Sequence, residues 1–236
     1  MTGPRQIPLD LPLPASRLGT DFLTSPSNQA AWDAITRPQD WPDQRLVLTG
    51  PEGAGKTHLA EIWADQVNAA SATASELTEA RMAQLIAAPA IVVEDVDRIA
   101  ALPGPVRRQI ETVLFHLYNL AAAEHVPLLL TGRRAPAHWR IELPDLASRV
   151  LAMAHVRIDE PDDALLTSIL NKLFQDRQMQ VNADVLEYLV RRIERSFAST
   201  ERIVARLDEA ALANQRGITR PLAAEVLAED DPMTDD

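Results

Sequence analysis

The stretch Leu48-Thr49-Gly50-Pro51-Glu52-Gly53-Ala54-Gly55-Lys56-Thr57 decides the fold of this chain. It has the spacing G-x-x-x-x-G-K-[ST], follows the apolar run 46–48 and leads into a helical pattern. A P-loop needs this strand–loop–helix context, because its backbone N–H groups curl round an anion at the positive end of the helix. The alternative is a glycine-rich turn that happens to end in Lys-Thr. The full spacing and the flanks favour the P-loop, and we predict that a nucleotide binds here.

The residues of this loop have separate expected roles. Lys56 would reach the β- and γ-phosphates, and the Thr57 hydroxyl would hold Mg²⁺. The expected ligand is therefore ATP or ADP with Mg²⁺. Nucleotide contacts are expected from Gly50, Pro51, Glu52, Gly53, Ala54, Gly55, Lys56, Thr57 and His58.

The composition argues against several other kinds of site. The formal net charge of −11 argues against a large nucleic-acid-binding face, although a local basic patch at 133–134 stays open. The absence of cysteine excludes disulfides and thiol catalysis, and the 5 histidines lack metal-ligand spacing. No apolar run reaches the ~18 residues of a membrane span, and proline and aspartate interrupt the N-terminal apolar stretch. We expect a cytoplasmic protein without a membrane anchor or a signal peptide.

Strands and helices are expected to alternate between residues 21 and 160. The predicted strands are 45–49, 69–73, 90–93, 127–131 and 156–158. The predicted helices are 29–37, the one after the P-loop, 76–87, one that starts at 104–105, and 144–151. This alternation predicts an α/β fold, a parallel five-stranded sheet with helices on both faces.

The pattern changes after Pro161, where amphipathic helices follow one another without a strand between them. These helices are predicted over 162–177, 182–195, 197–213 and 220–227. The expected domains are an extended arm over 1–20, an α/β nucleotide-binding domain over 21–160, a small all-α domain over 161–228 and an acidic, disordered tail over 229–236.

Acidic and polar side chains follow two of the predicted strands. Glu94 and Asp95 come directly after 90–93, and Thr131 ends 127–131. The carboxyl ends of parallel strands face the ligand crevice. We expect Glu94 to hold Mg²⁺ together with Thr57, Asp95 to orient an attacking water, and Thr131 to bind the γ-phosphate or that water. The alternative is a charged strand end that faces solvent.

Arg149 lies on the helix predicted over 144–151. Its guanidinium is expected to reach the γ-phosphate of a neighbouring subunit as an arginine finger. The alternative is an arginine that is simply solvated.

The order of these motifs resembles the AAA+ ATPases, and more closely DnaA and its short relatives, over about residues 20–228. The stretch 22–28 resembles the Phe-x-x-Gly-x-x-Asn box near the adenine, with Ser25 in place of the glycine. The stretch 129–134 resembles the sensor I strand, and 144–149 resembles the box that carries the arginine finger. The resemblance implies that 161–228 is a lid domain and that Phe22, Leu23 and Asn28 contact the adenine.

The chain departs from the DnaA pattern in three places. It stops before a helix-turn-helix domain, so no direct sequence-specific DNA binding is expected. An alignment on 218–219 puts Ala198 where the sensor II arginine is expected, and Arg202 lies one turn later as a substitute that contacts the nucleotide. Glu94 stands where aspartate is more usual, and its longer side chain changes the metal geometry.

The arm contains the hexapeptide Gln6-Ile7-Pro8-Leu9-Asp10-Leu11. Four prolines between Pro4 and Pro14 forbid a helix there. The hexapeptide resembles the motif Gln-Leu-x-Leu-x-Leu, by which bacterial proteins bind the sliding clamp, the beta subunit of DNA polymerase III. The resemblance implies that Gln6, Ile7, Leu9 and Leu11 bind the clamp. Packing of the arm on its own domain is the alternative.

The combined features resemble the family of regulatory inactivators of DnaA, named Hda or HdaA. The implied function is negative regulation of DNA replication initiation: the clamp-bound protein stimulates hydrolysis of DnaA-bound ATP through Arg149. One alternative is an AAA+ ATPase that loads or remodels a partner such as a helicase by its own hydrolysis. Another is an adaptor in which nucleotide is only structural. The working nucleotide, intrinsic hydrolysis and homo-oligomer formation all stay open.

Overall fold

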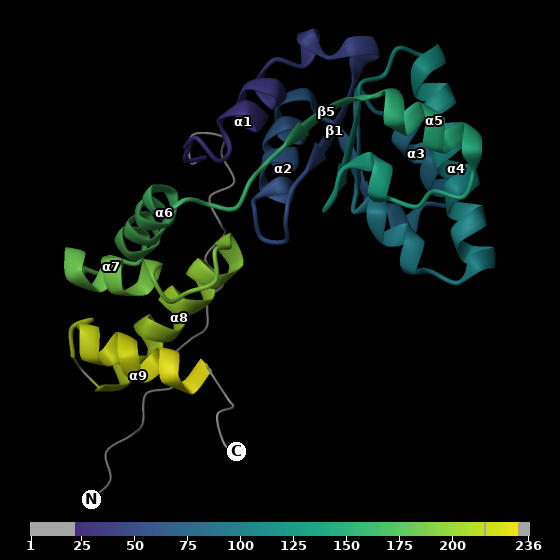
Figure 1. Ribbon diagram of the computed structural model, residues 1–236. Coiled ribbons are helices and arrows are strands. Elements are labelled where there is room, and N and C mark those ends of the chain that lie inside the picture. The colour runs from purple at the N-terminus through teal and green to yellow at the C-terminus, as the bar shows by residue number, and fades with distance from the viewer. Residues whose placement is uncertain (1–21, 215, 231–236) are drawn as a thin grey trace, which may run out of the picture.

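The computed structural model describes residues 22–214 and 216–230. The arm with Gln6, Ile7, Leu9 and Leu11 therefore lies outside the described residues. The described chain forms an α/β unit and a separate helical unit that lies beside one end of it (Figure 1).

The α/β unit is built on one sheet of 5 strands in the order β2-β3-β4-β1-β5. Every pair of neighbouring strands is parallel, and Leu130 of β4 lies opposite both Val47 of β1 and Val93 of β3. The carboxyl ends of these three strands therefore lie together at one edge. The strands are β1 (Arg45–Thr49), β2 (Ala70–Thr73), β3 (Ile91–Glu94), β4 (Leu128–Gly132) and β5 (Ala154–Arg157).

Helices cover both faces of the sheet, as predicted (Figure 1). Successive side chains of β1 point to opposite faces, so Leu46 and Leu48 pack with α1 and α2 while Val47 packs with α3, α4 and α5. The helices are α1 (Gln29–Thr36), α2 (Lys56–Val67), α3 (Glu79–Ile86), α4 (Gly104–Ala123) and α5 (Pro144–Ala152). Short 3₁₀ turns lie at η2 (Pro38–Asp40), η3 (Pro42–Gln44), η4 (Ala74–Glu76), η5 (Val96–Ala101) and η6 (Pro136–His138).

A buried carboxylate fixes the loop that leads into α5. Glu111 of α4 is only 1% exposed. It accepts backbone hydrogen bonds from Glu142 and Leu143, at 2.8–3.1 Å, and pairs with Arg107 at 2.9 Å. A buried charge needs such partners, because an unpaired one is strongly destabilising. Glu111 thus sets where α5 begins.

The helical unit has a hydrophobic core of its own, centred on side chains such as Leu170, Phe174 and Leu207. Its helices are α6 (Asp163–Asp176), α7 (Ala183–Val190), α8 (Phe197–Asn214) and α9 (Arg220–Asp230). Helix α7 is shorter than the predicted 182–195, because the chain turns after Val190 toward the α/β unit. There the Ser196 hydroxyl accepts a hydrogen bond from Ser199 N at 3.1 Å, which caps the first turn of α8.

Three further details concern the ends and faces of helices. Asn28 precedes α1, but its side chain does not cap the helix; it accepts from Ser25 N at 2.8 Å and donates to Leu23 O at 2.9 Å. Leu120 of α4 is 39% exposed. Helix α9 continues to Asp230, into the predicted acidic tail.

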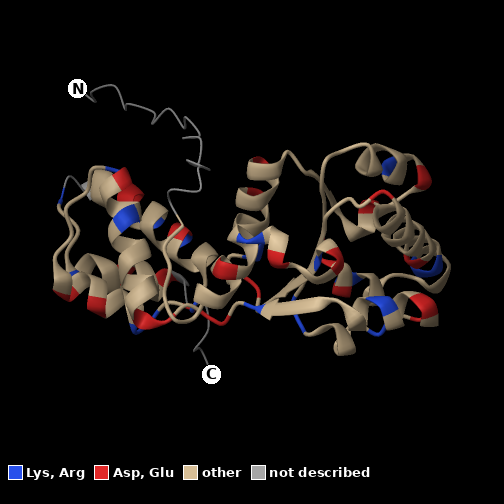
Figure 2. Ribbon diagram, turned by 90° about the horizontal axis from the view of Figure 1, so that it is seen from above, with Lys and Arg blue, Asp and Glu red and all other residues tan. Residues whose placement is uncertain are grey.

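Over residues 22–214 and 216–230, no helix has both the length and the apolar character needed to cross a membrane. In the same part of the chain, Lys and Arg are interspersed with Asp and Glu over both units (Figure 2).

Candidate nucleotide site

The loop between β1 and α2 has the backbone of an anion cradle. Gly53 and Gly55 have φ values of +72° and +96°, which side-chain-bearing residues rarely adopt. There is also no room for a side chain at two of the glycines. A β-carbon on Gly53 would overlap Ser196, and a β-carbon on Gly50 would overlap the Ile158 carbonyl. Ala54 N donates to Pro51 O at 3.3 Å and tightens the turn. The glycine spacing read from the sequence thus corresponds to real steric limits.

Lys56 is the first residue of α2 and is 8% exposed. Its ammonium donates to Gly50 O at 2.9 Å and to Pro51 O at 2.8 Å. An ammonium group has three donors, so one remains for a phosphate oxygen while two brace the loop. Burial lowers the pKa of Lys56, and the nearby carboxylates of Asp95 and Asp97 act in the opposite direction.

The ends of β3 and β4 bring the predicted acids to the loop. The Thr57 hydroxyl donates to Glu94 Oε2 at 2.6 Å. The Thr131 hydroxyl accepts from Asp95 N at 3.1 Å, which ties the end of β4 to the end of β3. The Thr57–Glu94 couple presents oxygen ligands of the kind that Mg²⁺ prefers, beside the loop that would hold the phosphates. These contacts support the grouping that the sequence predicted.

Burial raises the pKa of Glu94, and the hydrogen bond from Thr57 opposes that shift. The raised pKa means that ionised Glu94 costs stability in the folded protein. The cost is absent at low pH, where Glu94 is protonated, and appears as the pH rises through its pKa in the folded state.

Glu94→Gln is therefore expected to raise the melting temperature of the nucleotide-free protein at pH 8. The gain should shrink as the pH falls, because protonated Glu94 is already neutral. Thermal unfolding of both proteins across a pH series, without nucleotide, measures this difference. Asp145→Asn, at an exposed position on α5, is the control. A gain that stays constant with pH would contradict the burial argument.

A cavity of about 290 Å³ opens over the loop, and part of its lining was not predicted. Glu52 pairs with Arg133 at 2.8 Å and with Arg98 at 3.6 Å, and Arg98 also pairs with Asp95 at 3.2 Å. These pairs join the P-loop to the segments after β3 and β4. Arg133 comes two residues after the predicted end of β4, within the basic pair at 133–134.

The helical unit closes one side of this cavity. Phe197 N donates to Gly53 O at 2.9 Å, and Ala198 and Glu201 line the cavity with Phe197. Arg202, expected as the sensor II substitute, instead lines a cavity inside the helical unit. Its neighbour Glu201 lines the cavity over the P-loop. Adjacent residues point about 100° apart on a helix, so the two side chains face different cavities. The Arg202 assignment is therefore not supported by its placement.

The expected adenine box lies beside the first turn of α2. Phe22 stacks on Trp32 at 4.9 Å between ring centroids and on His58 at 5.8 Å. The Asn28 side chain folds the segment back through its bond to Leu23 O. Phe22 is thus held against His58 of the P-loop helix, and Asn28 is bonded to Leu23, the residue after Phe22.

Arg149 belongs to α5, which lies beside α4 on one side of the sheet (Figure 1), and it is not among the residues that line this cavity. Its side chain is exposed, and its guanidinium carbon lies 5.3 Å from the Phe115 ring centroid and 5.5 Å from that of Tyr118. Arg45 also lies over Tyr118, at 4.4 Å. Cation–π contacts of this kind hold a guanidinium without neutralising it.

The helical unit and the whole fold both have known counterparts. Residues 163–227 match the family model described as Hda, lid domain. Domain III of the replication initiation protein DnaA from Thermotoga maritima has a TM-score of 0.76 at 18% identity, over 93% of this chain and 98% of that one. Residues 163–227 therefore match an Hda-type lid, and the chain as a whole has the fold of DnaA domain III. The predicted AAA+ fold is confirmed, and the lid match agrees with the predicted Hda-type family.

Two nucleotide complexes also have folds similar to that of this chain. One is the replication initiator DnaA bound to AMPPCP and single-stranded DNA, with a TM-score of 0.69 and 16% identity over 83% of this chain and 67% of that one. The other is the FIGL-1 AAA domain in complex with ADP, with a TM-score of 0.64 and 20% identity over 89% and 81%. At these identities the similarity establishes the fold.

Proposed function

We propose that this chain is a negative regulator of replication initiation that, bound to the sliding clamp, stimulates hydrolysis of ATP bound to DnaA. The observation that carries the proposal is the position of Arg149. It is exposed, held on aromatic rings of α4, and apart from the cavity over its own P-loop. A guanidinium placed this way is available to a phosphate on another molecule, as an arginine finger requires.

The chain's own nucleotide, ATP or ADP, would lie over the P-loop. Lys56 would bind its phosphates, backbone N–H groups of the glycine loop would surround them, and Phe22 and His58 would lie near the base. Mg²⁺, held through Thr57 and Glu94, would neutralise phosphate charge. Because Phe197 of the lid bonds Gly53 of the loop, bound nucleotide would stabilise the lid against the sheet.

An AAA+ ATPase that loads or remodels a replication partner by its own hydrolysis is the second candidate. The Thr57–Glu94 and Thr131–Asp95 contacts favour it, because they are the parts that intrinsic hydrolysis needs. The two candidates differ in whose ATP is consumed.

The test mixes DnaA carrying labelled ATP, clamp loaded on DNA, and the full chain with unlabelled nucleotide. We expect conversion of the label to ADP to accelerate only when all three are present. Replacement of Gln6, Leu9 and Leu11 by alanine should remove the clamp-dependent acceleration and leave nucleotide binding intact, because these side chains are the proposed clamp contacts. Asp10→Ala, at a variable position of the same hexapeptide, is the matched control.

Two outcomes would count against the proposal. Unchanged acceleration by the triple variant would remove the role of the arm. Fast turnover of the chain's own ATP, without DnaA, would favour the second candidate.

A further inference from the structure

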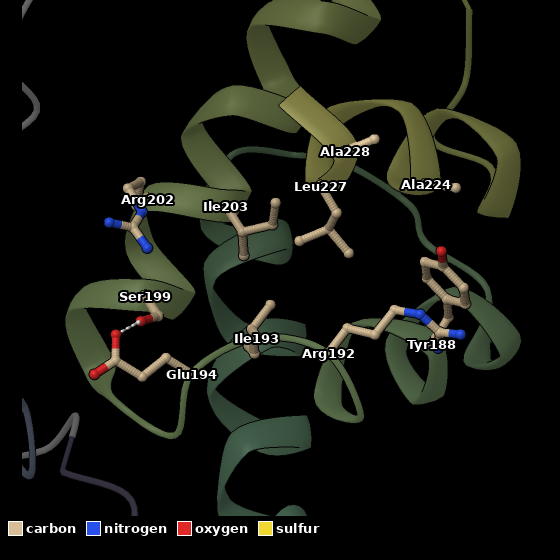
Figure 3. A pocket seen from close by; sticks show the side chains of 10 residues that line it. All are labelled: Tyr188, Arg192, Ile193, Glu194, Ser199, Arg202, Ile203, Ala224, Leu227 and Ala228. Carbon is tan, nitrogen blue, oxygen red and sulfur yellow. Dashed lines mark hydrogen bonds between the residues drawn. The ribbon is translucent and has the colours of Figure 1, made fainter. Parts of the chain in front are cut away.

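The lid contains a cavity of about 560 Å³, larger than the one over the P-loop (Figure 3). Ile193, Ile203 and Leu227 form its aliphatic middle, and Arg192 and Arg202 lie at its opposite ends (Figure 3). A pocket with an apolar middle between two cations fits a short segment that has an apolar side chain between acids.

The arginines of this cavity lack acidic partners within the described part of the chain. Neither Arg192 nor Arg202 has a carboxylate within ion-pair distance there, whereas many arginines of the chain do. Arg192 lies 4.0 Å from the Tyr188 ring centroid, which holds its guanidinium in place. The acid in the lining, Glu194, accepts a hydrogen bond from the Ser199 hydroxyl at 3.3 Å. The cavity is therefore net positive in a chain whose formal net charge is −11.

Residues 231–236 have the complementary pattern. Their sequence is Asp231-Pro232-Met233-Thr234-Asp235-Asp236, an apolar side chain between acids. They follow α9 directly, and Leu227 and Ala228 of α9 line the cavity. By contrast, residues 1–21 carry two arginines and two aspartates, so charge does not select them.

The end of α9, which this segment follows, lies next to the cavity. Glu229, near the end of α9, pairs with Arg206 of α8 at 3.1 Å. Arg202 precedes Arg206 by one helical turn, about 6 Å along the same face of α8. An extended chain rises ~3.3 Å per residue, so a chain that leaves α9 next to Arg206 reaches Arg202 within about two residues. The same rise gives a span of ~13 Å between positions 231 and 235.

We propose that residues 231–236 dock in the lid cavity of their own chain, with Asp231 at Arg202, Met233 on the aliphatic middle and Asp235–Asp236 at Arg192. The short connection to α9 gives the segment a high effective concentration, so weak contacts suffice. The cavity wall is bonded to the P-loop side of the lid: Ser199 bonds Ser196, and Phe197 bonds Gly53. Docking therefore restrains the part of the lid that meets the P-loop. The proposal does not depend on the function proposed above.

Disulfide trapping in the full chain tests the docking, because the natural sequence has no cysteine. Thr234→Cys combined with Ala224→Cys, in the cavity lining, should form an intramolecular disulfide under mild oxidation. The control pair joins Thr234→Cys to Leu212→Cys, an exposed position that lies about 9 Å along α8 from Arg206, away from Arg202. Position 224 lies about as far from position 230 along α9 as position 212 lies from Arg206 along α8, so the two cysteine pairs are matched in this distance. We expect clearly faster cross-linking to position 224.

Charge variants supply the second arm of the test. Arg192→Glu with Arg202→Glu should slow the cross-link about three- to tenfold, the effect of two exposed ion pairs. Lysine at positions 231, 235 and 236 should restore it. Arg192→Gln with Arg202→Gln is the milder variant if the reversal unfolds the lid. Equal rates at 224 and 212, or no effect of charge, would overturn the proposal. A disulfide-linked dimer would show that a second copy supplies the segment, and would also overturn it.

Discussion

Arg149→Ala is expected to lower the stimulated hydrolysis of DnaA-bound ATP by about 10³-fold or more, the usual contribution of an arginine finger. The side chain is exposed, and among the described residues its contacts are cation–π contacts with Phe115 and Tyr118. Its removal should therefore leave the melting temperature and the chain's own nucleotide affinity close to wild type. The measurement is the rate at which labelled ATP on DnaA becomes ADP, with saturating clamp and DNA.

Two variants separate the finger from a general charge effect. Arg149→Lys keeps the charge but loses the planar fork that binds two phosphate oxygens, so it should recover little activity. Arg108→Ala removes one exposed positive charge from α4 and should behave as wild type. Normal stimulation by Arg149→Ala would exclude the finger and favour an adaptor whose nucleotide is structural.

The sequence predicted the parts of the site that local rules determine. The glycine spacing and the position of Lys56 follow from the backbone that an anion cradle needs, and the structure has that backbone. Glu94 and Thr131 could be placed together because the carboxyl ends of parallel strands share one edge of a sheet. The bounds of β1 to β4 were predicted to within one residue, because their apolar runs are short and bordered by charged or proline residues. Strand β5 was predicted over 156–158 but begins two residues earlier, at Ala154.

Other features could not be predicted because they depend on distant contacts. The end of α7 is set by the turn that brings Phe197 to Gly53, and helical periodicity carries no information about that contact. The Glu52–Arg133 pair joins segments far apart in the sequence. Whether Glu201 or Arg202 faces the P-loop depends on how α8 is rotated in the assembled lid.

Lys56→Met is expected to weaken ADP and ATP binding about 10²- to 10³-fold, because the loss of one partner from a buried, hydrogen-bonded charge pair costs about 3–4 kcal/mol. Methionine keeps the packing of the apolar stem but has no donor for a phosphate oxygen. Isothermal titration with each nucleotide, with and without Mg²⁺, measures the change. Lys172→Met, on α6 of the lid, removes the same charge and should bind normally.

Lys56 also braces the loop, so this variant distinguishes two roles of nucleotide. Phe197 of the lid bonds Gly53 O, and Lys56 bonds the adjacent carbonyls of Gly50 and Pro51. If bound nucleotide fixes the lid, Lys56→Met should lose both binding and the stimulation of DnaA, although Arg149 is intact. Stimulation that survives the loss of binding would mean that Arg149 and the arm act without nucleotide. Unchanged binding would show that the nucleotide site lies elsewhere than at the P-loop.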